Sequence, residues 1–162
     1  MAKSSRKAAA PKPPGAVSIQ TVLCATDLSD CSQHALSQAA ELAEAYDAKL
    51  VVVHVVELWD SRYDFLVSDL SRRLEQAANE QLERELAHWG KSEKVPVEVM
   101  VRKGSAAIEV LKAVKDAKAD LVVVGSHGKG ALDRILLGSV ADKVLHAATT
   151  PLVLVRAQAG AK

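Results

Sequence analysis

The sequence has few of the residues that build disulfide frameworks, metal centres or membrane spans. It contains two cysteines, Cys24 and Cys31, and no Cys/His spacing typical of a metal site. No apolar run approaches the roughly 20 residues that a membrane helix requires, and the apolar segment 50–56 includes His54. These absences exclude a disulfide-rich scaffold. They predict a soluble, cytoplasmic protein without a membrane partner.

An excess of either charge is also missing. The chain has 21 basic and 20 acidic residues, for a net charge of +1. Four cations and no acid lie within residues 1–16, so the remainder carries −3 and is not expected to bind nucleic acid. We predict a disordered basic Ala/Pro-rich tail over 1–16, one domain over 17–156, and a short tail over 157–162.

Short β-branched runs alternate with segments of helical periodicity from residue 17 onward. This alternation predicts a single-domain, Rossmann-like α/β fold with helices on both faces of a parallel sheet. Pro96 indicates that the third strand lies at a sheet edge. The expected strands are 17–25, 49–56, 95–101, 121–124 and 152–155. The expected helices follow caps at Ser29 and Ser105, span about 68–89, and run from 138–139 to about 147.

Apolar stripes indicate which side of each helix faces the sheet. The predicted inward residues of the first helix are Leu36, Ala39, Ala40 and Ala43, and those of the second are Leu70, Leu74, Ala78, Leu82, Leu86 and Trp89. Those of the third are Ile108, Leu111 and Val114. The third helix is expected to end at Lys118. A loop is expected over 59–69. Its aromatic residues are interpreted as packing on their own domain, with a lid or partner surface as the alternative.

The fourth strand leads into Gly125-Ser126-His127-Gly128-Lys129-Gly130, and nine residues separate Gly128 from Gly138-Ser139. Glycines allow sharp bends and close approach of the backbone, and the amides at the start of a helix favour anions. Ligands of parallel sheets bind beyond the carboxyl ends of the strands. This segment therefore predicts a phosphate site, to which Lys129 and Arg134 could add positive charge.

Two common phosphate motifs do not match this segment. A P-loop ending in Gly128-Lys129 would need glycine at Val123 and Ser or Thr at Gly130. A dinucleotide fingerprint would need a third glycine at Asp133. The sequence therefore disfavours both a P-loop enzyme and an NAD-binding protein.

Several parts of the sequence resemble the ATP-binding branch of the universal stress protein family. They are the segments CATDLSD and LVVVHVVE, the pattern Gly125-x-x-Gly128-(nine residues)-Gly138-Ser139, and the C-terminal stretch through Arg156. The resemblance covers residues 19–156. It implies an adenine nucleotide alpha hydrolase-like sheet of five parallel strands in the order 3-2-1-4-5. The implied ligand is ATP, with Mg²⁺ held mainly by phosphate oxygens.

The resemblance also implies a set of binding residues. Asp27 would face the ribose or adenine, and Val55 would contact the base through its backbone. The whole predicted set is Ala25, Thr26, Asp27, Val55, Gly125, Ser126, His127, Gly128, Gly138, Ser139 and Val140, with no catalytic or metal-ligating residue assigned. By the same resemblance, Ala25 and Thr26 would lie beside adenine. The glycines, Ser139 and the Val140 amide would hold phosphates.

Several of these residues also have a simpler interpretation. Asp27 could only stiffen the turn before the first helix, and His127 could be solvated. His54 is interpreted as a hydrogen-bonded core residue. Cys31 lies in the first turn of a helix, where redox sensing is a minor alternative, whereas Cys24 is expected to be inert.

The favoured function is a nucleotide-dependent regulatory module of the stress response, without dedicated turnover. The alternatives are a slow ATPase or nucleotidyl-transfer enzyme, and an adaptor that binds another adenylate. The apolar segment 151–155 is predicted to form a sheet edge that pairs with its copy in a homodimer.

Overall fold

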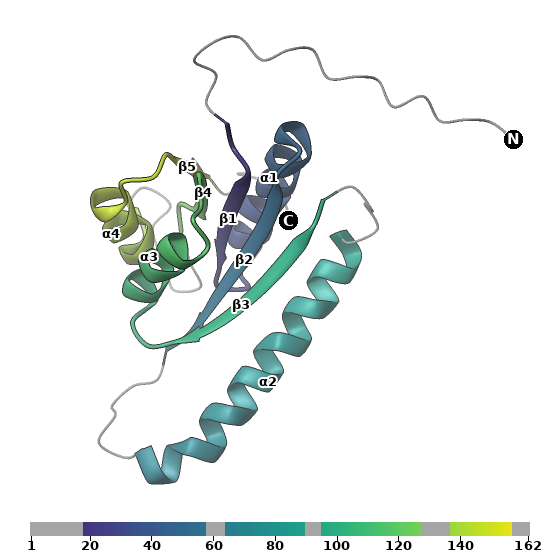
Figure 1. Ribbon diagram of the computed structural model, residues 1–162. Helices are drawn as coiled ribbons and strands as arrows, with labels where there is room; N and C mark the ends of the chain where they lie inside the picture. Colours follow the sequence, from purple (N-terminus) through teal and green to yellow (C-terminus); the bar gives the residue numbers. More distant parts are fainter. Residues whose placement is uncertain (1–17, 58–63, 90–94, 128–136, 157–162) are drawn as a thin grey trace, which may run out of the picture.

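The computed structural model describes residues 18–57, 64–89, 95–127 and 137–156, and it shows a five-stranded parallel sheet between two layers of helices (Figure 1). The strand order β3-β2-β1-β4-β5 confirms the prediction. The predicted tails 1–16 and 157–162 lie outside the described residues. The elements are β1 Thr21–Thr26, α1 Asp30–Tyr46, β2 Lys49–Val56, α2 Asp64–Trp89, β3 Val97–Lys103, α3 Ala106–Asp116, β4 Leu121–Gly125, α4 Ser139–Ala147 and β5 Leu152–Val155.

The central strands are apolar on both faces because helices cover both sides of the sheet. Alternate residues of β1, β2 and β4, including Val22, Val52 and Val123, pack against α1 and α2. The residues between them, including Leu23 and Val122, pack against α3 and α4. Burial of each such side chain contributes about 1.5–3 kcal/mol, so these two layers hold the strand ends in fixed positions.

Helix α1 begins as the sequence predicts. Ser29 has extended backbone and accepts a hydrogen bond from Ser32 N, while the Ser32 hydroxyl bonds Ser29 N in return. This reciprocal capping satisfies amides that a helix otherwise leaves unpaired. The predicted stripe is confirmed, with Leu36, Ala39 and Ala43 buried and Ala40 partly buried against the same core.

Helix α3 differs from the prediction in its inward face and in its cap. Ile108 is 54% exposed, and the buried residues are Ala107, Val110, Ala113 and Val114. The small alanines face the sheet and leave little space between helix and strands, so the bulky isoleucine lies outside. Ser105 occupies the N-cap position without a side-chain hydrogen bond.

The acceptor at the start of α3 comes from another element. Glu57, which directly follows β2, accepts a hydrogen bond from Ala106 N at 3.0 Å through Oε1. The carboxylate also lies at the positive end of the helix dipole. The helix ends at Asp116, before the predicted Lys118, which has φ of 50° in the left-handed region.

Helix α2 is longer than predicted because it begins at Asp64, within the expected loop 59–69. Spacing of four residues already links Leu66, Leu70 and Leu74, so the helical pattern extends upstream of residue 68. Ala78, Leu82 and Leu86 are buried as predicted, but Leu74 is 41% exposed. Trp59 and Tyr63 lie outside the described residues. None of the described helices is long and apolar enough to cross a membrane.

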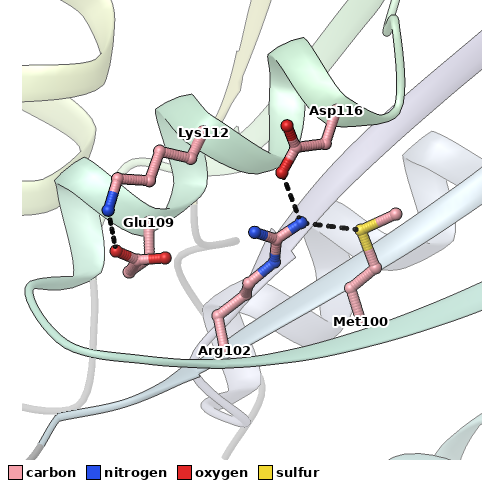
Figure 2. A network of polar contacts seen from close by, with 5 residues as sticks. All are labelled: Met100, Arg102, Glu109, Lys112 and Asp116. Atoms are coloured by element: carbon pink, nitrogen blue, oxygen red, sulfur yellow. Dashed lines mark hydrogen bonds and ion pairs between the residues drawn. The ribbon is translucent and has the colours of Figure 1, made fainter.

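Strand β3 forms one edge of the sheet, as Pro96 indicated, and α2 runs beside it (Figure 1). The strand starts at Val97 and extends to Lys103, two residues later at each end than predicted. Arg102 donates to Asp116 of α3 at 2.8 Å and lies 3.8 Å from Met100 Sδ (Figure 2). This contact joins the edge strand to the helix that follows it.

Candidate functional site

The switch point of the sheet lies between β1 and β4, because the chain winds outward from β1 to β3 and then returns to place β4 on the other side of β1. The register pairs Thr26 with His54 and Ala25 with Val124. Continuing it by one or two residues brings Asp27, Val55 and Ser126 to the same end of the sheet. The structure therefore groups the described parts of the predicted site.

Asp27 occupies the turn that follows β1, and its carboxylate braces that turn. Its Oδ1 accepts hydrogen bonds from Ser29 N at 3.1 Å and from Ser29 Oγ at 2.5 Å. The turn-stiffening interpretation of Asp27 therefore describes a contact that is present. The orientation of the carboxylate is fixed before any ligand arrives, and ligand contact by Asp27 stays a prediction.

Buried hydroxyl groups support the same turn from beneath. Thr26 Oγ1 lies 3.0 Å from Ser32 Oγ and accepts from Leu28 N at 3.1 Å, and both hydroxyl residues are buried. Leu28 has φ of 63°, a left-handed conformation that is unfavourable for leucine. Sequence reasoning missed Ser32, because a serine three residues after Ser29 does not match the usual Ser/Thr-x-x-Glu/Gln signal.

Val55 lies one residue beyond His54, the last residue of β2 that pairs with β1. Lys49 N donates to Gln20 O, whereas Leu50 N donates to Pro96 O, so odd-numbered residues of β2 direct their backbone groups toward β1. If the pairing continued, the N–H of Leu28 would donate to Val55 O, but it donates to Thr26 Oγ1 instead. The carbonyl of Val55 therefore lacks its strand partner in the described part of the chain.

His54 is hydrogen-bonded as interpreted, but it is half-buried rather than in the core. Its Nδ1 lies 2.8 Å from Thr26 O. The side chain thus links the end of β2 to the last residue of β1. It supports the position of the turn rather than offering a free group.

Gly125 has a packing role that the sequence did not predict, and its ligand role stays a prediction. A Cβ at this position would lie 3.2 Å from Cys31 Sγ, which is tighter than ordinary packing, and 3.4 Å from Cys31 O. Gly125 therefore allows the first turn of α1 to approach the end of β4. The prediction that this glycine serves ligand approach is not needed to explain it.

Ser126 connects three elements and is only 2% exposed. Its N–H donates to Val155 O of β5 at 2.7 Å, and its carbonyl accepts from Gly138 N at 2.8 Å. Its hydroxyl lies 2.7 Å from His127 Nδ1. Ser126 is therefore a structural junction at the start of the glycine segment.

Helix α4 begins without a side-chain cap, because Gly138 occupies the N-cap position. The amide of Gly138 itself donates to Ser126 O and is not available for a phosphate. The amides of Ser139, Val140 and Ala141 have no acceptor among the described residues. Ser139 is exposed and Val140 is half-buried, and Gly128 lies outside the described residues.

His127 presents one polar atom that the described structure leaves unsatisfied. Its Nε2 is buried and has no hydrogen-bond partner in the part of the chain that the structure describes. Buried polar atoms normally have a partner, so such an atom requires an explanation.

The cysteines behave as buried, unpaired residues. Burial raises the pKa of the Cys24 thiol to about 12, so the thiolate is absent at neutral pH. This confirms that Cys24 is inert. Over residues 18–57, 64–89, 95–127 and 137–156, no group of three His, Cys, Asp or Glu side chains could hold a metal ion.

The strand order and the switch point define a Rossmann-like α/β protein. The model of the universal stress protein family matches residues 18–156, and the chain belongs to that family. A universal stress protein of Thermus aquaticus is 37% identical over 140 residues, covering 85% of this chain and 98% of the relative.

Two solved structures extend the comparison. UspA of Lactobacillus plantarum is 20% identical with a TM-score of 0.78, covering 87% of this chain and all of that one, and shows the shared fold. A universal stress protein in complex with cAMP is 25% identical with a TM-score of 0.58, covering 86% and 98% of the two chains.

Proposed function

We propose that the protein binds ATP at the carboxyl ends of β1, β2 and β4 and acts as a regulatory module of the stress response. The observation that carries this proposal is the start of α4. Its first three amides have no acceptor among the described residues, and Gly138 provides no side-chain cap. Such a helix start attracts anions through its N–H groups and its dipole.

The adenosine end of the ligand has complementary groups on the other side of the switch point. The carbonyl of Val55 is an acceptor suited to the exocyclic amine of adenine. Asp27 is held by two hydrogen bonds from Ser29, so its carboxylate can accept from ribose hydroxyls with little loss of freedom. Ala25 and Thr26 would line the base.

ATP is favoured over other adenylates by the glycine pattern, which continues through Gly128 to Gly138 and suits an extended polyphosphate. The relative solved with cAMP supports an adenine nucleotide more generally. An adaptor that binds AMP or a cyclic nucleotide is therefore the second candidate. Mg²⁺ would be held mainly by phosphate oxygens, as is common for this ion.

Binding without dedicated turnover fits the described side chains better than catalysis. ATP hydrolysis needs a positioned base and groups that stabilise transition-state charge. Asp27 is occupied by Ser29 through Oδ1, and His127 Nδ1 is occupied by Ser126. A slow ATPase or nucleotidyl-transfer activity is the alternative, and measured phosphate release decides between them.

We also propose a homodimer through β5. The strand is short, apolar and at the sheet edge, so its outward backbone groups can pair with those of a second copy. The two unpaired cysteines fit a reducing compartment, and the proposed location is the cytoplasm.

The first experiment identifies the nucleotide. Mass spectrometry of material released from freshly purified protein should find ATP, and calorimetry should rank ATP and ADP above AMP and cAMP in the presence of Mg²⁺. Phosphate release should be negligible. Absence of heat at millimolar concentrations of every adenylate would refute the proposed function.

A charge placed at the start of α4 tests the site. Ser139→Asp supplies a carboxylate at the helix start, where it stabilises the helix but competes with phosphate, so ATP affinity should fall at least about tenfold. Ser105→Asp introduces the same charge at the N-cap of α3 and should leave affinity unchanged. Equal effects of the two variants would contradict this location.

A further inference from the structure

The buried Nε2 of His127 is the atom in the candidate site with the clearest need for a partner. The same ring is held through its other nitrogen, because His127 Nδ1 lies 2.7 Å from Ser126 Oγ. A neutral imidazole carries its proton on one nitrogen only. The direction of the Ser126 hydrogen bond therefore decides whether Nε2 is a donor or an acceptor.

The inventory of buried groups favours one direction for this hydrogen bond. If Nδ1–H donated to Ser126 Oγ, the buried serine proton would have no acceptor in the described residues and Nε2 would still be unpaired. If Ser126 O–H donates to Nδ1, the serine is satisfied and only Nε2–H remains. Because unpartnered buried groups are unfavourable, the second arrangement is preferred.

Ser126 has little freedom to abandon this arrangement. Its N–H is fixed to Val155 O and its carbonyl to Gly138 N, and the residue is 2% exposed. The hydroxyl is therefore presented to His127 by a backbone that two neighbouring elements hold. His127 also follows directly on the residue that tethers the uncapped start of α4.

We infer that Ser126 is a positioning residue that holds His127 as an Nε2–H donor for a phosphate oxygen of the bound nucleotide. This inference rests on the proposed function, because it names the group that recognises the phosphate. A phosphate oxygen supplies the acceptor that Nε2–H lacks, and hydrogen bonds to charged groups are stronger than neutral ones. Ser126 itself does not touch the ligand.

Amide replacements of His127 separate its two nitrogens. Glutamine places its NH₂ near the position of Nε2, whereas asparagine places its NH₂ near that of Nδ1. His127→Gln should keep ATP affinity within about threefold of the native protein, and His127→Asn should lower it about tenfold. The same two changes at His146, an exposed histidine of α4, are the controls and should have no effect.

Ligands of different charge show whether the lost contact is to phosphate. The difference between His127→Gln and His127→Asn should be large for ATP, smaller for AMP and absent for adenosine. Inorganic triphosphate tests whether the contact needs the nucleoside. Equal loss with adenosine would mean that the substitution only disturbs the fold, and the inference would be wrong.

The tautomer can be read directly by ¹⁵N NMR of the imidazole nitrogens. The native protein should show protonated Nε2 and unprotonated Nδ1. Ser126→Ala should mix the tautomers and weaken ATP binding about fivefold, and Ser126→Thr, which keeps the hydroxyl, should restore both. Protonated Nδ1 in the native protein would overturn the inference even if no variant folds.

Failure of this inference is distinguishable from failure of the proposed function. If the native protein binds no adenylate, the proposed function fails. If it binds ATP and both His127 variants bind equally well, ATP binding stands and His127 is not the donor.

Discussion

The two edges of the sheet differ in the way they meet their surroundings. At the β3 edge, Glu98, Arg102 and Lys103 form ion pairs with Lys49, Asp116 and Glu75, respectively. At the β5 edge, the strand Leu152–Val155 contains only leucine and valine. Charged side chains discourage pairing at an edge strand. The β3 edge is therefore protected by the chain's own charges, and the β5 edge is not.

Helices α3 and α4, which pack on the same face of the sheet, show a related contrast at their starts. At the start of α3, the Glu57 carboxylate accepts from Ala106 N. At the start of α4, Gly138 provides no side chain for this purpose. At α3 an internal anion accepts from the helix start, and at α4 a ligand phosphate could do so. We therefore expect the partner and the phosphate end of the ligand on the β4–β5 side.

The largest expected effect comes from placing a charge on the apolar β5 edge. Pro151 O and Val155 O face β4, so the backbone groups of Leu152 and Leu154 face outward. Leu154→Lys would bring two cations together across the proposed twofold axis and remove an apolar contact. The dimer should weaken at least about 100-fold, which light scattering during size-exclusion chromatography would detect.

The matched change on the other edge is Val97→Lys. Val97 is 42% exposed and Leu154 is 36% exposed, so the two substitutions start from similar environments. Val97→Lys should leave the oligomeric state unchanged. A dimer that resists Leu154→Lys but dissociates with Val97→Lys would reverse the assignment of the edges.

A smaller effect is expected from removing the internal anion at α3. Glu57→Ala leaves Ala106 N without its acceptor and should lower the free energy of unfolding by about 1 kcal/mol, as loss of a helix cap does. Urea denaturation measures the change. Ser105→Ala is the control and should cost less than about 0.5 kcal/mol, because that side chain makes no capping bond.

The smallest effect concerns the ion pair that joins β3 to α3 (Figure 2). Arg102→Ala should reduce stability by at most about 1 kcal/mol, because the pair is partly exposed and screened by solvent. Lys112→Ala removes the local pair with Glu109 within α3 and should cost less. Loss of several kcal/mol in Arg102→Ala would show that the β3 edge depends on this contact.

The order of the strands could be predicted because the family resemblance supplied it and the apolar runs fixed the number and position of the elements. The inward face of α3 could not, because periodicity alone gave more weight to the bulky Ile108 than to Ala107 and Ala113. The start of α2 was placed too late because the helical stripe was followed only from Leu70 onward. The error in α3 arises where tertiary packing decides between locally acceptable alternatives.

The candidate site was predictable in its positions but not in its contacts. Asp27, Val55 and Ser126 lie at the same end of the sheet as expected. The donation from Gly138 N to Ser126 O and the bracing of Asp27 by Ser29 required coordinates. Glu57 as the acceptor at α3 joins residues 49 positions apart, and no local signal could have found it.

The close fit between Gly125 and Cys31 has a consequence for mutagenesis of the glycine segment. Even a methyl group at position 125 would press on the sulfur of Cys31, so the first turn of α1 would have to give by a few tenths of an ångström. The displaced helix carries the serines that orient Asp27. Weaker nucleotide binding by Gly125→Ala would thus report a shifted helix as readily as a lost phosphate contact.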